Sequence, residues 1–72
     1  GVKTVAAPST FVPFDTPVPN TNYYVGYLSS VDPANADLAI AVYPVRNADK
    51  AVGGFTCRPT DACIVTYIAV LQ

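Results

Sequence analysis

Histidine, glutamate, methionine and tryptophan are all absent from this sequence of 72 residues, and only 12% of its residues are charged. Without histidine, the Ser-His-Asp and Cys-His arrangements that serve much of nucleophilic catalysis are excluded. The chain also has no glycine-rich phosphate loop. Its only side-chain carboxylates are five aspartates in or next to expected turns, where aspartate commonly bonds the local backbone. We therefore expect this protein not to be an enzyme.

Basic residues are equally scarce. The four lysines and arginines are scattered along the chain and the net charge is −1, so no basic cluster is available to neutralise a run of nucleic-acid phosphates. No uninterrupted apolar segment is long enough to cross a bilayer. Two cysteines without histidine do not complete a metal-ligand set. We expect no nucleic-acid partner, no membrane insertion, no metal and no cofactor.

What the chain has in excess is apolar surface. Hydrophobic residues make up 51% of the sequence, while the charged fraction is about half that of an ordinary soluble domain. A chain of this size buries only about 60% of its unfolded surface on folding, so its stability as a monomer is marginal. Burial against sister chains is the simplest remedy, and we expect a homo-oligomer.

The pattern of β-branched and aromatic residues predicts an all-β domain with five or six short strands in a small antiparallel sandwich. Alternating apolar residues on both faces of 38–46 predict a strand that is covered twice, and Pro44 argues against a helix there. Turns are expected at 16–22, 32–37, 47–54 and 59–61. The expected strands are 2–7, 9–15, 23–31, 38–46, 55–58 and 62–71.

Cys57 and Cys63 flank the expected reversal at 58–62. If the flanking strands pair as a hairpin centred on Thr60, the two side chains lie opposite each other and a disulfide is sterically allowed. The alternative is a pair of small, buried, reduced thiols, as in a protein that folds in a cytosol. The sequence leaves both states open.

The five tyrosines all fall on expected strands, at positions 23, 24, 27, 43 and 67. One interpretation is packing in the core or between subunits, with the hydroxyl at the rim. The other is a stacking platform for sugar rings, assisted by polar groups of the neighbouring loops. The candidate ligand-binding residues of that platform are Asn35, Asp37, Arg46 and Asp49.

Three motifs follow one another in the chain: FDTPVPNTNYYV at 14–25, GGFT at 53–56 and VTYIAV at 65–70. Together they resemble the small C-terminal domains of bacteriophage tail fibres and, more distantly, the H-type lectins. The resemblance covers residues 10–71. Val18 stands where that family usually has an aromatic residue and Tyr67 where tryptophan is commoner. The charged residues with which H-type lectins hold a sugar have no counterpart here, so no lectin site is transferred.

The resemblance implies a six-stranded sandwich that trimerises at the distal tip of a fibre, with Phe14 and Phe55 as packing residues. In that case residues 1–72 are a single domain, the C-terminal part of a longer fibre protein. The protein would belong to the virion, assemble in the host cytoplasm, and bind a host glycan or an outer-membrane component. The alternative is a structural domain that trimerises or caps the fibre without binding a receptor.

Overall fold

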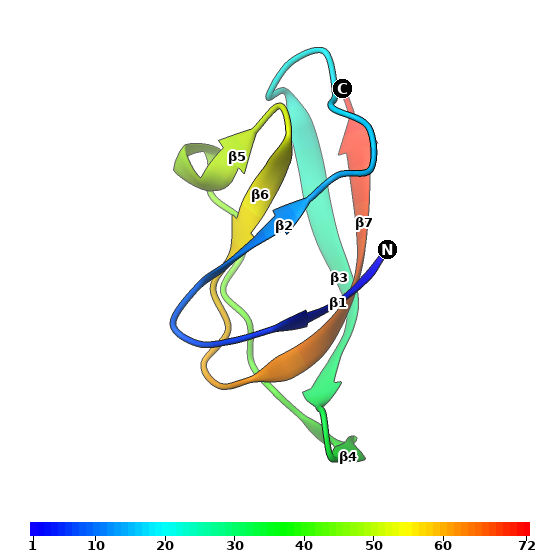
Figure 1. The fold of residues 1–72 in the computed structure, drawn as a ribbon, viewed down its shortest axis with the longest axis vertical. Coiled ribbons are helices and arrows are strands. Elements are labelled where there is room, and N and C mark those ends of the chain that lie inside the picture. The colour runs from blue at the N-terminus through cyan, green and yellow to red at the C-terminus, as the bar shows by residue number, and fades with distance from the viewer.

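Seven strands and one short 3-10 turn make up the computed structural model of this protein, which describes all residues 1–72 (Figure 1). The strands are β1 (Val2–Val5), β2 (Thr10–Pro13), β3 (Tyr23–Asp32), β4 (Asn35–Ala39), β5 (Lys50–Ala51), β6 (Gly54–Cys57) and β7 (Cys63–Leu71), and the turn η1 is Asn47–Asp49.

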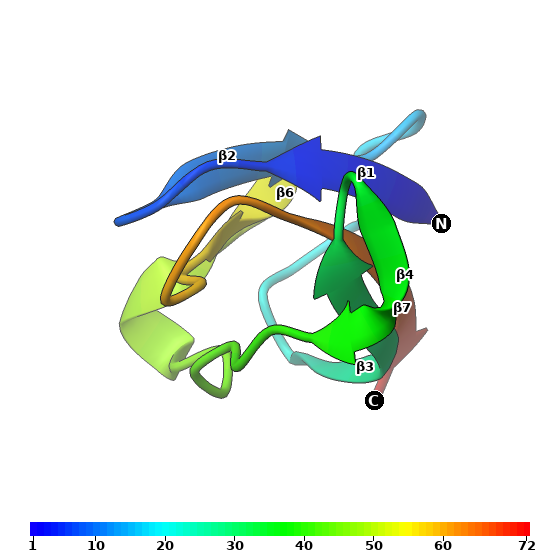
Figure 2. The same cartoon turned by 90° about the horizontal axis from the view of Figure 1, so that it is seen from below.

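The strands form two antiparallel sheets, one of four strands in the order β1-β7-β3-β4 and one of three in the order β2-β6-β5. Seen from below, β3, β4 and β7 lie on one side of the molecule and η1 on the other, while β1 and β2 overlap across the top of the view (Figure 2). The predicted all-β class with two antiparallel sheets is therefore confirmed. The count differs from the expected six strands, because the short strand β5 forms inside the expected turn at 47–54.

The pair β3–β7 runs along the long axis of the molecule (Figure 1). It is antiparallel from Tyr23↔Leu71 to Val31↔Ile64, and a bulge between Tyr27 and Ser29 leaves Leu28 without a partner. Both strands agree with the sequence prediction to within a residue at each end. Their density of β-branched and aromatic residues explains this agreement, because such side chains suit a pleated, half-buried surface.

The core lies between the two sheets. Three of its residues come from β1 and β7 and three from β2 and β6, and each is at most 2% exposed: Val5, Cys63, Val65, Val12, Phe55 and Cys57. Phe55 is fully buried, as the sequence predicted, and its ring centroid lies 5.1 Å from that of Tyr67 and 6.0 Å from that of Phe14. Such aromatic pairs add to the stabilisation from burial.

The predicted strand at 38–46 is wrong beyond Ala39. Strand β4 begins already at Asn35, inside the expected loop at 32–37, because only Pro33 and Ala34 are needed for the turn. Residues 40–46 then leave the four-stranded sheet and run to η1. Ile40, Val42 and Val45 pack against the core from this irregular segment, so these apolar residues are buried on one side without belonging to a sheet.

The predicted hairpin between the cysteines is also wrong. Strands β6 and β7 belong to different sheets, so Cys57 lies opposite Thr10 and Cys63 opposite Val5. Both are free thiols with no exposed surface. Burial raises the pKa of each thiol, since it disfavours the thiolate. The structure thus has the reduced form of the two that the sequence left open.

We expect both thiols to react with a thiol reagent only after unfolding, because no thiolate is exposed in the native state. Titration in denaturant should give two thiols per chain, and reductant should leave the midpoint of thermal unfolding unchanged. A denatured chain with no titratable thiol would contradict the reduced form.

Candidate functional site

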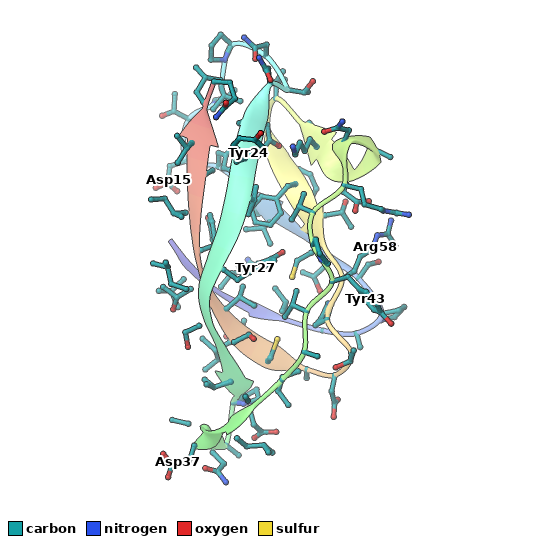
Figure 3. All side chains as sticks on the ribbon, turned by 180° about the vertical axis from the view of Figure 1, so that it is seen from behind. Asp15, Tyr24, Tyr27, Asp37, Tyr43 and Arg58 are labelled. Atoms are coloured by element: carbon teal, nitrogen blue, oxygen red, sulfur yellow. The ribbon has the colours of Figure 1, made fainter.

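The four residues proposed from the sequence fall into two separate groups. Asn35 and Asp37 lie on β4, and Figure 3 shows Asp37 at the lower tip of the molecule. Arg46 and Asp49 flank and end η1, well above that tip, and contact each other. The structure therefore does not unite the four residues in one site.

At the β4 end, polar side chains form hydrogen bonds to the nearby backbone. The Asn35 side-chain oxygen accepts a hydrogen bond of 3.0 Å from the Asp37 backbone N–H. One residue before the turn, the Asp32 carboxylate accepts one of 2.8 Å from the Ala34 backbone N–H. These are the local bonds by which Asp and Asn stabilise turns. They account for Asn35 and Asp32 without any ligand.

The second group is a buried carboxylate held by two arginines, which we call the Asp49 cluster: Asp49, Arg46 and Arg58. Arg46 binds both carboxylate oxygens through Nε and Nη2, each at 3.2 Å. Arg58 donates to the Asp49 Oδ1 from Nε at 3.1 Å and from Nη2 at 2.9 Å. The bidentate contact of Arg46 is the geometry in which guanidinium and carboxylate fit best.

Local structure explains how these residues meet. The turn η1 is closed by a 2.9 Å hydrogen bond from the Asp49 backbone N–H to the Arg46 carbonyl, which places residues three apart on one side. Arg58 directly follows β6, the strand that neighbours η1 in space. The cluster thus ties the irregular segment before β5 to the end of a core strand.

Burial is distributed unevenly within the cluster. The side chain of Asp49 is 2% exposed, whereas those of Arg46 and Arg58 are 63% and 40% exposed. Hydrogen bonds from Arg58, and then from Arg46, hold the pKa of Asp49 well below its usual value of 3.8 despite its burial. In return, the Asp49 carboxylate raises the pKa of Arg58. The solvent-exposed part of the cluster therefore consists of the two arginine side chains, and the carboxylate is buried beneath them.

The lowered pKa of Asp49 predicts how stability depends on pH. A carboxyl group with a lower pKa when folded than when unfolded stabilises the native state above its unfolded pKa, and that contribution is lost as pH falls. We expect stability to decrease as the pH drops below about 4, the unfolded value. Asp49→Asn should weaken this decrease and lower stability at neutral pH by about 1 kcal/mol, since both arginine side chains are partly exposed and solvent screens the ion pairs.

Thermal unfolding of the wild-type protein and of Asp49→Asn between neutral and acidic pH measures both effects. Asp37→Asn is the matched control, because the Asp37 carboxylate takes part in no hydrogen bond or ion pair within the chain and is exposed. An Asp49→Asn protein with the same acid sensitivity as the wild type would contradict the role given to this carboxylate.

Tyr43 lies on the surface next to Arg58. Val42 and Pro59 form an antiparallel bridge, and the Tyr43 backbone N–H donates a 3.0 Å hydrogen bond to the Arg58 carbonyl. Tyr43 and Arg58 are therefore directly opposite each other, which places their side chains on the same face. Figure 3 shows them next to each other on one side of the molecule, and Tyr43 is 62% exposed.

Three of the four basic residues lie within 46–58: Arg46, Lys50 and Arg58. Asp49 is the only acid in that stretch, and the other four aspartates lie elsewhere in the chain. The Lys50 ammonium lies 3.2 Å from the Asn47 side-chain oxygen and 5.7 Å from the centroid of the Tyr24 ring. The net charge of −1 therefore conceals a basic region beside η1.

The sequence pointed to Arg46 and Asp49 but not to Arg58. The residue follows the first cysteine of the expected hairpin, and no spacing rule brings it to Asp49. Arg58 lies beside Tyr43 and η1 for two reasons that the sequence pattern does not show. Strands β6 and β7 belong to different sheets, and Val42 forms a bridge with Pro59.

The structure contains no pocket, and nowhere do three side chains of His, Cys, Asp or Glu gather in a way that would hold a metal. None of its helical segments has the length and apolar character needed to span a membrane. Comparison with protein-family models, curated proteins and solved structures finds no match for this chain.

Proposed function

We propose that this protein is a homotrimeric attachment domain, the distal domain of a phage tail fibre, which binds a glycan on the host cell surface. The observation that carries the proposal is an uncharged, largely apolar face formed by β1, β3 and β7 of the four-stranded sheet. The motifs that resemble tail-fibre domains and the exposed basic and aromatic surface at Arg58 and Tyr43 support it.

The apolar face follows from the strand register. Cys63 and Val65 point into the core, so the alternate residues of β7 point outward, and their partners on β1 and β3 share that side. We call this set the outer face: Val2, Thr4, Tyr24, Gly26, Ser29, Val31, Ile64, Thr66, Ile68 and Val70. None of these residues is charged.

Large apolar side chains on the outer face are unusually exposed for a soluble protein. Val2 is 68%, Tyr24 66% and Ile68 50% exposed. Leu28, the extra residue in the bulge of β3, is 72% exposed. Large apolar side chains exposed on one face of a sheet in this way are typical of an interface between chains. We assign it to sister chains, since a closed symmetric assembly would also relieve the marginal stability of so short a chain.

Receptor binding is then the role of surfaces that the sister chains leave uncovered. The basic region beside η1 adjoins the three-stranded sheet and not the strands of the outer face, whereas the β4 end is the edge of the four-stranded sheet next to β3. Repetition of a shallow site in three copies raises the overall affinity for a surface that carries many copies of a glycan. An open site without a pocket suits such multivalent attachment.

Binding of the fluorescently labelled protein to a panel of bacterial strains and to their isolated surface polysaccharides tests the proposal. Because the predicted residues form two separate groups, each group is tested by its own variant. One carries Asn35→Ala and Asp37→Ala at the β4 end, and the other carries Arg46→Ala beside η1. We expect the labelled trimer to bind some of the strains and one group of substitutions to abolish that binding.

The structural alternative predicts a different result. A domain that only trimerises or caps the fibre would form a trimer and bind none of the strains or polysaccharides. That outcome would overturn the receptor-binding part of the proposal and leave the trimer in place. Retained binding by both sets of variants would place the receptor site elsewhere on the domain.

A further inference from the structure

We propose that Arg46, Arg58 and Tyr43 form a subsite for the anionic group of an acidic saccharide, a carboxylate or a phosphate carried on a sugar ring. The proposal rests on the receptor-binding function given above and specifies the chemical class of the receptor. The geometry of the Asp49 cluster and of its aromatic neighbour carries it.

The two arginines hold more positive charge than the buried carboxylate requires. Arg46 alone gives Asp49 a bidentate pair, and Arg58 adds a second full charge to the same carboxylate. Asp49 is almost completely enclosed, whereas the side chains of Arg46 and Arg58 are 63% and 40% exposed. The exposed part of the cluster therefore carries a net positive charge.

Each guanidinium also keeps a free donor group. Both arginines use Nε and Nη2 for Asp49, and in neither does the Nη1 amino group make a hydrogen bond within the chain. Because Asp49 fixes both side chains from behind, little conformational entropy remains to be lost when these donors bind an anion. Carboxylate and phosphate oxygens are the acceptors that such donors bind best.

Tyr43 supplies the contact expected for the sugar ring itself. Its side chain shares a face with that of Arg58 and is mostly exposed, and it does not take part in the ion pairs (Figure 3). An aromatic ring beside a cation thus presents an apolar surface next to a positive charge. A pyranose that bears an acidic group has the complementary arrangement, with an apolar ring face next to a negative charge.

This assignment changes the role predicted for Asp49. Its carboxylate oxygens are occupied by the arginines and its side chain is 2% exposed, so it does not contact a ligand. It is a positioning residue that orients both guanidinium groups. Arg46 and Arg58 are the residues that contact the anion, and Arg58 was not among the candidates from the sequence.

The experiment measures binding of four probes to the full chain by calorimetry at low ionic strength. Oligogalacturonate carries the carboxylate and glucose 6-phosphate the phosphate, whereas fully methyl-esterified oligogalacturonate and glucose are their neutral counterparts. We expect binding of at least one acidic probe, no binding of its neutral counterpart, and weaker binding as salt is added. Which acidic probe binds identifies the anionic group.

Two variants that preserve the fold test the residues. Tyr43→Ala removes the ring without touching the ion pairs, and Arg58→Lys keeps the charge and a partner for Asp49 but loses the planar fork of donors. We expect each to weaken binding about tenfold, the effect of losing one charge-assisted or stacking contact. Lys3→Ala is the matched control, because it removes one positive charge from an exposed position on β1.

Binding of neither acidic probe would overturn the subsite, as would equal binding of the neutral counterparts. Variants of Tyr43 and Arg58 that bind like the wild type, or an equal loss in Lys3→Ala, would also overturn it. Adhesion to cells that survives all these substitutions refutes the subsite and leaves the attachment function intact. Binding of an acidic probe by a chain that adheres to no cell refutes attachment and leaves the subsite intact.

Discussion

Gly54→Ala is expected to lower the free energy of unfolding by about 3 kcal/mol or more, a loss typical of overpacking in a core. Gly54 is buried at the start of β6, opposite Pro13 of β2. A methyl group added there would overlap the Val12 carbonyl oxygen and lie 2.8 Å from the Pro13 Cα. Both are backbone atoms of a paired strand, so they can retreat only if β2 and β6 separate.

The magnitude matters because the molecule is small. At about 0.05–0.15 kcal/mol per residue, a chain of this length has roughly 4–11 kcal/mol of stability. The loss is therefore a large share of the total, and it falls beside Phe55, the most enclosed aromatic residue of the core. Urea unfolding monitored by circular dichroism gives the free energy directly.

Gly53→Ala is the matched control, one residue away. A methyl group at Gly53 would meet no atom within 4 Å, and its backbone has no positive φ that a side chain would oppose. We expect this variant to be as stable as the wild type or slightly more stable, because alanine restricts the unfolded chain. Equal effects of the two substitutions would contradict the close approach of β2 and β6.

The local sequence pattern predicted the long strands but not the sheets to which the two cysteines belong. Strands β3 and β7 were predictable because their composition and length favour a strand in any context. The placement of Cys57 and Cys63 on different sheets was not, because a short reversal serves equally well as a hairpin turn and as a passage between sheets. The burial of Val12 and Val65 on opposing sheets selects the passage, and that choice depends on the whole core.

The candidate site was less predictable than the fold for the same reason. Arg46 and Asp49 are three residues apart, and a single turn explains their contact. Arg58 lies nine residues from Asp49 in the sequence and contacts it only because of how the chain folds. Tyr43 lies opposite Arg58 only because of the isolated bridge between Val42 and Pro59. Asn35 and Asp37 were predicted as ligand-binding residues because Asn and Asp suit both loops and ligands. In the structure the Asn35 side chain bonds the Asp37 backbone N–H, and the Asp37 carboxylate has no partner within the chain.

If the protein is the proposed homotrimer, Ile68→Lys is expected to convert it into monomers at micromolar concentration. Ile68 lies near the middle of β7 on the outer face, is half exposed in the single chain, and has only Gly26 opposite it on β3. The small partner leaves its side chain accessible to a neighbouring chain. A lysine buried there without a counter-charge costs several kcal/mol per copy, since no residue of the outer face is charged.

Sedimentation equilibrium measures the change as a fall from about 23 kDa, three times the chain mass of 7.6 kDa, to the chain mass itself. Val52→Lys is the control, because Val52 is 47% exposed and lies in the turn between β5 and β6 of the other sheet. If folding depends on assembly, the unfolding midpoint of the wild type also rises with protein concentration. A wild-type protein that stays monomeric and folded would contradict an interface at the outer face and leave the exposure of Tyr24, Leu28 and Ile68 without an explanation.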